Sequence, residues 1–190
     1  MIHSPAFKLT TERLILRLAT QDDLLAILQF YQDNQAHLAP FEPARPKQFW
    51  TEPYWQEQVH LSWEGFQSGQ FLRLFLFENQ RPRSIVGTAN FNNIVRGAFQ
   101  ACHLGYSLAN SAQGKGYMTE ALRSAIPYVF DELNLHRIMA NYMPHNHRSA
   151  RVLERLGFSI EGCAKNYLLI NGQWEDHILT SLTNDRWRSG

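Results

Sequence analysis

The segment from residue 113 to residue 118 combines residue types that could hold a phosphate group. It lies between an expected strand and a long expected helix, and its residues are Gln113, Gly114, Lys115, Gly116, Tyr117 and Met118. Glycines let the backbone adopt positive φ angles and let a ligand approach without meeting a Cβ atom. The first N–H groups of a helix point outward at the positive end of its dipole, which favours an anion. We therefore predict that this segment, called the glycine turn below, binds a diphosphate.

Other loops that contain glycine at this spacing have different requirements. A dinucleotide-binding loop needs a third glycine three residues after the second, and Thr119 stands there. The G-x-x-x-x-G-K-[ST] loop of nucleotide triphosphatases is absent, because Lys115 lies between the two glycines. The alternative that stays open is an ordinary loop whose glycines ease the chain into a helix.

The glycine turn resembles the Gln/Arg-x-x-Gly-x-Gly/Ala signature of the GNAT acetyltransferase superfamily. Gln113, Gly114 and Gly116 match its core, and Met118 stands where many members carry glycine or alanine. Longer segments are similar to the branch of this superfamily that acetylates ribosomal proteins at their N-termini, and they cover residues 90–97, 104–108, 136–146, 155–158 and 167–174. The likeness extends from about Leu9 to Trp187.

This resemblance implies an α/β (α+β) fold of the acyl-CoA N-acyltransferase type. The expected architecture is a mixed, mostly antiparallel sheet with splayed central strands and flanking helices, formed by a single domain over residues 1–190. The implied cosubstrate is acetyl-CoA, with no metal. Coenzyme A would lie where the strand that ends at Leu108 splays from the strand that ends at Met143.

The resemblance also implies which residues contact coenzyme A. The glycine turn would hold the diphosphate, and the backbone of Ser107, Leu108 and Ala109 would pair with the pantetheine amides and the thioester. Arg148 and Arg151, with Lys115, could meet the 3′-phosphate, since guanidinium matches phosphate oxygens. For each of these cations a solvated helix face is the alternative.

Amide formation from a thioester requires a neutral amine, a donor for the oxyanion and a route for the thiolate to leave. Asn146 and Ser149 fit an Asn-x-x-Ser pattern of the family, and the Ser149 hydroxyl could bond the departing sulfur. The same pair also suits the first turn of a helix, with Asn146 as its cap. Leu153 stands where many members carry a tyrosine that acts as general acid.

A general base is less evident. His103 occupies the strand position where many family members carry glutamate, and it could accept a proton directly or through water. Glu161 is an alternative base, and a structural histidine is the other interpretation of His103. An α-amino group with a pKa near ~8 needs less help to become neutral than a lysine near ~10.4. We therefore expect an N-terminal amine as the acceptor.

The acceptor is expected to enter an aromatic-lined slot. The residues that we assign to it are Phe41, Glu42, Asn90, Tyr106, Tyr142, His145 and Tyr167. The resemblance implies that the acceptor is the N-terminal alanine of a small-subunit ribosomal protein. Two alternatives stay open, namely an acetyltransferase for a polyamine or aminoglycoside, and a non-catalytic ribosome-assembly factor that binds acetyl-CoA.

Local patterns predict the elements that position these residues. Strands are expected at 13–18, 71–78, 84–95, 101–108, 136–143, 160–170 and 173–182, and helices at 20–35, 54–68, 117–133 and 146–156. Four prolines within residues 36–53 predict a stiffened loop that walls the site. Asn171 and Gly172 predict a two-residue hairpin turn.

Composition narrows the class of protein. The chain has 190 residues, 44% of them apolar, and a formal net charge of +1, which supplies no field for nucleic acid or an anionic membrane. Cys102 and Cys163 are expected to be reduced and buried. Residues 1–7 have no pattern of an export signal and no run is long enough for a membrane span. We expect a cytoplasmic protein.

Overall fold

The sheet of this protein places its strands in the order β1-β2-β3-β4-β5-β6-β8-β7. The computed structural model describes residues 7–188. The strands are β1 (Lys8–Thr10), β2 (Leu14–Arg17), β3 (Leu72–Glu78), β4 (Arg81–Val95), β5 (Ala101–Leu108), β6 (Arg137–Tyr142), β7 (Ser159–Ile170) and β8 (Gln173–Thr183). The helices are α1 (Leu24–Leu38), α2 (Glu52–Gln67), α3 (Tyr117–Asp131) and α4 (His147–Arg155).

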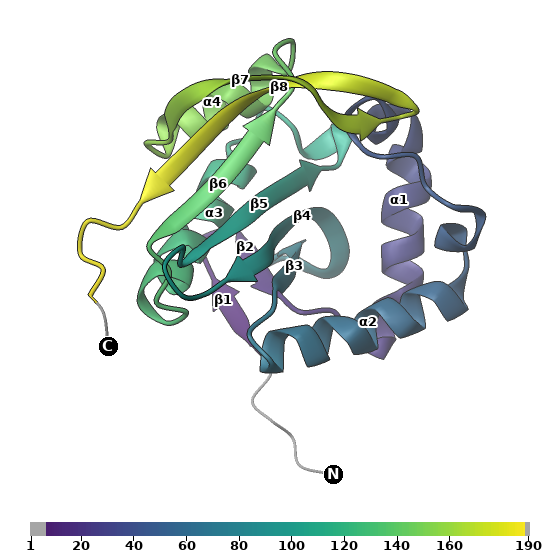
Figure 1. Cartoon of the computed structure of the whole chain (residues 1–190). Coiled ribbons are helices and arrows are strands. Elements are labelled where there is room, and N and C mark those ends of the chain that lie inside the picture. The colour runs from purple at the N-terminus through teal and green to yellow at the C-terminus, as the bar shows by residue number, and fades with distance from the viewer. Residues whose placement is uncertain (1–6, 189–190) are drawn as a thin grey trace.

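Neighbouring strands pair antiparallel except β5 and β6, which run parallel. A parallel pair needs a long crossover connection, and α3 supplies it behind the two strands (Figure 1). This arrangement confirms the expected α/β fold with a mostly antiparallel sheet.

Helices cover the sheet on both sides. Helix α3 packs against β1, β2, β4 and β5, and α4 packs against α3 and β6. Helices α1 and α2 pack against each other, against β4 and against β3. The side chains of α3 that repeat every three or four residues are buried, among them Leu122, Ile126 and Val129. Pro127 lies within this helix without ending it.

The first and second helices begin as local signals predict. The carboxylate of Asp23 accepts a hydrogen bond from the backbone N–H of Thr20 at 2.8 Å, as in a capping box, so the chain turns into α1 at the expected place. Helix α1 continues to Leu38, and Pro53 belongs to the first turn of α2, where a missing N–H costs nothing. The loop between them is therefore shorter than the predicted residues 36–53.

The β7–β8 hairpin is long and arches across the top of the molecule toward α1 (Figure 1). Its turn at Asn171 and Gly172 has φ angles of 45° and 83°, as the Asn-Gly pair predicts. The N–H of Asn171 donates to the carbonyl of Glu42 at 3.1 Å. The hairpin and the loop after α1 thus meet over the sheet.

Two expectations need correction or lie outside the described residues. Cys102 is fully buried, and burial raises the pKa of its thiol to about 12. Cys163, however, is exposed, because it lies on β7, the last strand of the sheet. The absence of an export signal was predicted largely from residues 1–6, which lie outside the described residues. Within residues 7–188, no helix has the length and apolar content that a membrane crossing requires.

Gly87 on β4 provides a test of how tightly the strands that carry the site are packed. A Cβ at Gly87 would lie 2.4 Å from the carbonyl oxygen of Ser107 on β5, whereas a Cβ at Gly105 would meet no atom within 4 Å. We expect Gly87→Ala to lower the free energy of unfolding by about 1–3 kcal/mol, because the backbone of β5 must move. Gly105→Ala is the matched control and should change it by less than about 0.5 kcal/mol. Chemical denaturation measures both, and equal stabilities would contradict the close approach.

Candidate functional site

Strands β5 and β6 form a fork. They pair at only three positions in the described chain, Ala101 with Arg137, Cys102 with Ile138 and His103 with Met139. Beyond His103 the strand β5 pairs with β4 alone, and β6 continues along β8. The expected splay of the central strands therefore begins at His103.

The glycine turn follows the open arm of the fork. Gly114 and Gly116 have φ angles of 72° and 79°, and Gly116 is the N-cap of α3. Residues 114–116 are exposed. Within residues 7–188, the backbone N–H groups of the six residues from Gly114 to Thr119 find no protein acceptor, and the first to be paired is that of Glu120. A run of free N–H groups at the start of a long helix is suited to bind an anion.

Side chains from two helices hold the start of this turn. The amide of Gln113 contacts the ring Nε2 of His37 on α1 at 2.7 Å and accepts a hydrogen bond from Arg148 on α4. One turn earlier on α1, the buried Asn34 accepts a hydrogen bond from the N–H of Asn110 at 2.8 Å. Arg148 is therefore engaged with Gln113, whereas Arg151 is exposed. Sequence reasoning missed His37 and Asn34, because no local pattern places α1 beside the turn.

The backbone of the open arm is only partly free. The N–H of Ala109 donates to the carbonyl of Val86 on β4 at 2.9 Å. Because successive residues of a strand direct their backbone groups to alternate edges, those of Ser107 also face β4. The backbone groups of Tyr106 and Leu108 then face the fork.

Ser149 and Tyr106 bridge the fork to α4. Their hydroxyl oxygens lie 2.7 Å apart, and the Tyr106 hydroxyl can also donate to the Ser149 carbonyl at 3.2 Å. Burial raises the pKa of Tyr106 above its ordinary value, so its hydroxyl keeps its proton. The backbone N–H of Ser149 donates to the side chain of Asn146, which caps α4. The capping interaction thus uses the backbone N–H of Ser149, and the Ser149 hydroxyl contacts Tyr106 instead.

His103 lies at the point where the fork opens. Its Nδ1 atom is buried and, within residues 7–188, has no hydrogen-bond partner. Burial lowers the pKa of His103 below its ordinary value, because desolvation penalises the charged ring. A neutral imidazole at this place can accept a proton.

Glu161 has a different environment. Its carboxylate forms an ion pair with Arg137 and accepts a hydrogen bond from the Ser181 hydroxyl at 2.9 Å. The hydrogen bond from Arg137 is the largest of the effects that lower the pKa of Glu161. Arg137 pairs with Ala101 at the closed end of the fork, so Glu161 lies beside the paired strands.

The structure brings together one pair of the residues assigned to the acceptor side and places Tyr167 among other residues. The rings of Phe41 and His145 are 6.0 Å apart, although they come from separate loops. Tyr167 on β7 lies 5.7 Å from the His177 ring, and the Asn141 amide donates to its hydroxyl at 3.4 Å.

The remaining acceptor candidates are spread around the fork. The carboxylate of Glu42 forms an ion pair with Arg45 at 2.5 Å. Asn90 lies opposite Gly105 in the β4–β5 register, and Tyr142 pairs with Ile178 at the end of β6.

Two cavities lie beside α1. One is a groove of about 850 Å³ between α1 and the start of β4, lined in part by Asp33, Arg83 and Ser111. The other has about 240 Å³ and lies beneath the contact of the hairpin with the loop after α1, with Tyr31 and Asn171 in its wall.

The fork, the glycine turn and the crossover helix have the arrangement expected of an acetyltransferase. A family model described as acetyltransferase (GNAT) domain matches residues 13–159, and the chain belongs to this family. It is an N-acetyltransferase by homology and fold. The resemblance seen in the sequence is thereby confirmed.

Relatives in the branch of ribosomal-protein acetyltransferases cover nearly the whole chain. The chain is 46% identical to the [Ribosomal protein uS5]-alanine N-acetyltransferase of Escherichia coli over 186 residues, which cover 98% of this chain and 95% of the relative. It is similar to the crystal structure of the ribosomal-protein-S5-alanine acetyltransferase of Vibrio fischeri, with a TM-score of 0.92, 41% identity and coverage of 96% and 100%. It is also similar to Mycobacterium smegmatis RimJ in complex with CoA-disulfide, with a TM-score of 0.84, 29% identity and coverage of 93% and 85%.

A double-mutant cycle tests whether the Tyr106 and Ser149 hydroxyls interact. Tyr106→Phe and Ser149→Ala each remove one partner, and we expect a coupling free energy of unfolding of about 0.5–1.5 kcal/mol, the net value of a hydrogen bond. Urea titration of the two single variants and the double variant measures it. Within residues 7–188, the Ser68 hydroxyl donates only to carbonyls of the helix that it follows, so the cycle of Tyr106→Phe with Ser68→Ala should be additive. Additivity in both cycles would show that the two hydroxyls do not interact.

Proposed function

We propose that this chain transfers the acetyl group of acetyl-CoA to the N-terminal α-amino group of a ribosomal protein, with the N-terminal alanine of small-subunit protein uS5 as the acceptor. The observation that carries the cosubstrate is the run of free backbone N–H groups at the end of one fork arm. The near full-length likeness to a uS5-alanine N-acetyltransferase supports the acceptor. A single domain performs the reaction in the cytoplasm, where ribosomal proteins are made.

Coenzyme A would lie along the open arm of the fork. The N–H groups of the glycine turn hold the diphosphate, and Gln113 braces the turn. The backbone of Leu108 and Tyr106, which faces the fork, pairs with the pantetheine amides and the thioester carbonyl. Arg151 on α4 and Lys115 in the glycine turn are exposed, and we assign them to the 3′-phosphate.

The reaction forms one bond and breaks one. The lone pair of the acceptor nitrogen attacks the thioester carbon, and the carbonyl oxygen becomes an oxyanion that backbone N–H groups of β5 stabilise. When the oxyanion collapses, the C–S bond breaks and the sulfur leaves as thiolate. The nitrogen gives up a proton, and the sulfur gains one.

Ser149 is the donor that we assign to the leaving sulfur. When the Tyr106 hydroxyl donates to the Ser149 oxygen, the Ser149 proton is free to point into the fork. Tyr106 therefore orients the Ser149 hydroxyl. This hydroxyl would take the role of the tyrosine that many family members carry at the position of Leu153. A thiol with a pKa near ~8.5 needs no stronger acid to leave.

His103 is the group that we assign to the departing amine proton, directly or through one water. Its place at the opening of the fork and a pKa that burial lowers, which keeps the ring neutral, support this role. Glu161 is assigned to its ion pair with Arg137 instead. The rings of Phe41, His145 and Tyr167 would line the path of the acceptor polypeptide.

A panel of acceptors tests the proposed function. With radiolabelled acetyl-CoA, we expect the highest kcat/KM for a peptide that carries the first residues of uS5 and begins with alanine. The same peptide with its N-terminus already blocked, but with an internal lysine, is the matched control and should remain unlabelled. Faster labelling of spermidine or of an aminoglycoside would select the small-molecule alternative. Tight binding of coenzyme A without turnover of any acceptor would select the non-catalytic one.

The pH dependence of kcat tests His103. A base must be neutral, and the pKa of His103 lies below its ordinary value, so kcat should rise with pH through a value below about 6.5. In His103→Gln we expect kcat to fall about 100-fold and this acid limb to disappear, because general base catalysis is worth about 10²–10⁴. His60 is an exposed histidine on α2, so His60→Gln should keep the profile of the unaltered protein. An acid limb that survives in His103→Gln would assign the proton to another group.

A further inference from the structure

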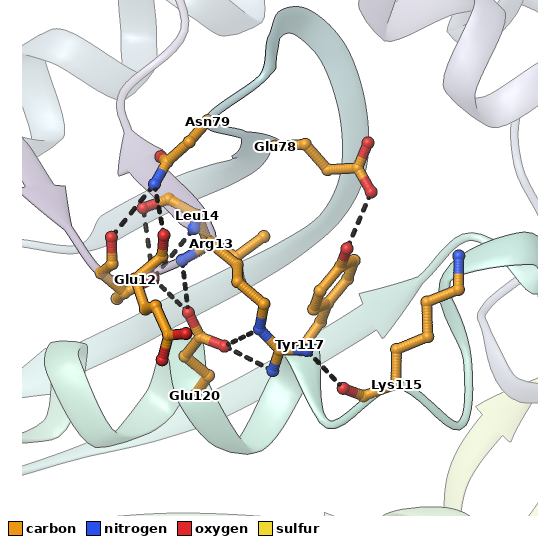
Figure 2. Close-up of polar contacts among 9 residues, drawn as sticks. Glu12, Arg13, Leu14, Glu78, Asn79, Lys115, Tyr117 and Glu120 are labelled. Carbon is orange, nitrogen blue, oxygen red and sulfur yellow. Dashed lines mark hydrogen bonds and ion pairs between the residues drawn. The ribbon is translucent and has the colours of Figure 1, made fainter.

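We propose that Arg13 and Glu120 are a positioning pair that sets the conformation of the glycine turn. This inference rests on the proposed role of the turn in binding the diphosphate of coenzyme A. Arg13 lies between β1 and β2, and Glu120 lies in the first turn of α3 (Figure 2).

The guanidinium of Arg13 contacts the helix and the turn at the same time. Its Nε donates to Glu120 Oε2 at 2.6 Å and its Nη2 lies 2.5 Å from the same oxygen. Its Nη1 donates to the backbone carbonyl of Lys115 at 2.9 Å. The guanidinium carbon also lies 4.7 Å from the centre of the Tyr117 ring. One side chain thus joins the glycine turn to the helix that follows it (Figure 2).

The contact with the Lys115 carbonyl determines where one backbone donor points. In a planar trans peptide the C=O and the following N–H point in opposite directions. Because Arg13 draws the Lys115 oxygen toward itself, the N–H of Gly116 must point away from Arg13. The Gly116 N–H is one of the donors without an acceptor within residues 7–188. Arg13 therefore aims a donor at the site that we assign to the diphosphate.

Glu120 fixes Arg13 in turn. Its Oε1 accepts hydrogen bonds from the Thr11 hydroxyl at 2.6 Å and from the Arg13 backbone N–H at 2.9 Å. Burial alone would raise the pKa of Glu120, but these hydrogen bonds and the charge of Arg13 outweigh it and lower the pKa. The carboxylate is therefore ionised at neutral pH. Arg13 cancels a charge that would otherwise repel an anion on the turn.

The β3–β4 hairpin holds the Arg13 segment in place. The Asn79 amide donates to the carbonyls of Thr11 and Glu12 at 3.1 Å and 2.9 Å, and the Asn79 N–H donates to the carbonyl of Arg13 at 2.9 Å. On the other side of the guanidinium, the Tyr117 hydroxyl donates to Glu78 at 2.9 Å. Two adjacent residues on the β3 side of the hairpin turn, Glu78 and Asn79, thereby contact the network (Figure 2).

A donor that lacks the diphosphate separates positioning from general stability. For Arg13→Ala we expect kcat/KM with acetyl-CoA to fall about 10- to 100-fold, the value of a charge-assisted hydrogen bond. The loss should appear in KM for acetyl-CoA and in the calorimetric affinity for coenzyme A, with kcat within about twofold. With acetyl-pantetheine, which has no diphosphate, kcat/KM should stay within about twofold. An equal loss with both donors would overturn the proposal, because it would show a structural effect on the whole site.

Further variants divide the role of the charge from the role of the geometry. Arg13→Lys keeps the charge but cannot reach Glu120 and Lys115 together, so it should lose affinity nearly as Arg13→Ala does. Full affinity in Arg13→Lys would overturn the geometric role. In Arg13→Ala with Glu120→Gln, the unpaired carboxylate is removed, and we expect only part of the affinity to return. Complete recovery would reduce Arg13 to a counter-ion and overturn the contact with Lys115 as the cause.

Arg186 provides the matched control. It lies in the segment after β8 and forms an ion pair at 3.4 Å with Asp131 at the other end of α3, so Arg186→Ala removes an arginine that contacts the same helix away from the turn. Its kcat/KM with both donors should equal that of the unaltered protein, and a donor-specific loss there would contradict the assignment to Arg13. If the unaltered protein itself bound no coenzyme A, the proposed function would fail before the role of Arg13 was tested.

Discussion

The short parallel pairing of β5 with β6 is the constraint on which the rest of the site depends. The two strands pair at three positions and then separate, and the crossover that joins them consists of the glycine turn and α3. A parallel pair cannot be joined by a tight turn, so a helix must begin near the end of β5. The N-terminus of that helix supplies the free N–H groups, and the separated arm supplies free backbone groups along the fork. One topological feature therefore provides both sets of backbone groups that we assign to acetyl-CoA.

The glycine turn has two physical requirements that conflict. To bind a diphosphate as proposed, its N–H groups must remain unpaired within the protein, yet a loop without internal hydrogen bonds loses its conformation easily. In this chain other residues bind a carbonyl and a side chain of the turn, and the N–H groups of the turn are not used. Arg13 binds the carbonyl of Lys115, and His37 and Arg148 bind the side chain of Gln113. The backbone is thereby fixed, while the N–H groups of residues 114–119 have no acceptor within residues 7–188.

This division also explains how much could be predicted from the sequence. The strand β5, the helix α3 and the Asn171–Gly172 hairpin carry local signals, and the structure has them where they were expected. Strand β1 has only three residues, which is too short for a recognisable pattern, so nothing local predicts it. The contacts of the site could not be predicted from local patterns either, because Arg13 and Glu120 are 107 residues apart and Tyr106 and Ser149 are 43 residues apart. Tyr106 was assigned to the acceptor, whereas its hydroxyl bonds to Ser149, and only the packing of α4 against the sheet determines that.

The charges around the fork bear on the choice of acceptor. Arg137 pairs with Glu161 and Lys165 pairs with Asp176, while burial keeps His103 neutral and Tyr106 protonated. No unpaired carboxylate among residues assigned to the fork would then stabilise an ammonium group, and desolvation favours the neutral amine. An α-amino group with a pKa near ~8 needs about 1.4 kcal/mol to be neutral at pH 7, whereas a lysine near ~10.4 needs about 4.6 kcal/mol. Burial of the amine favours its neutral form, so the smaller amount is easier to supply in this way. A site for lysine or a polyamine would need a carboxylate base, so the neutral surroundings of His103 themselves favour an N-terminal amine.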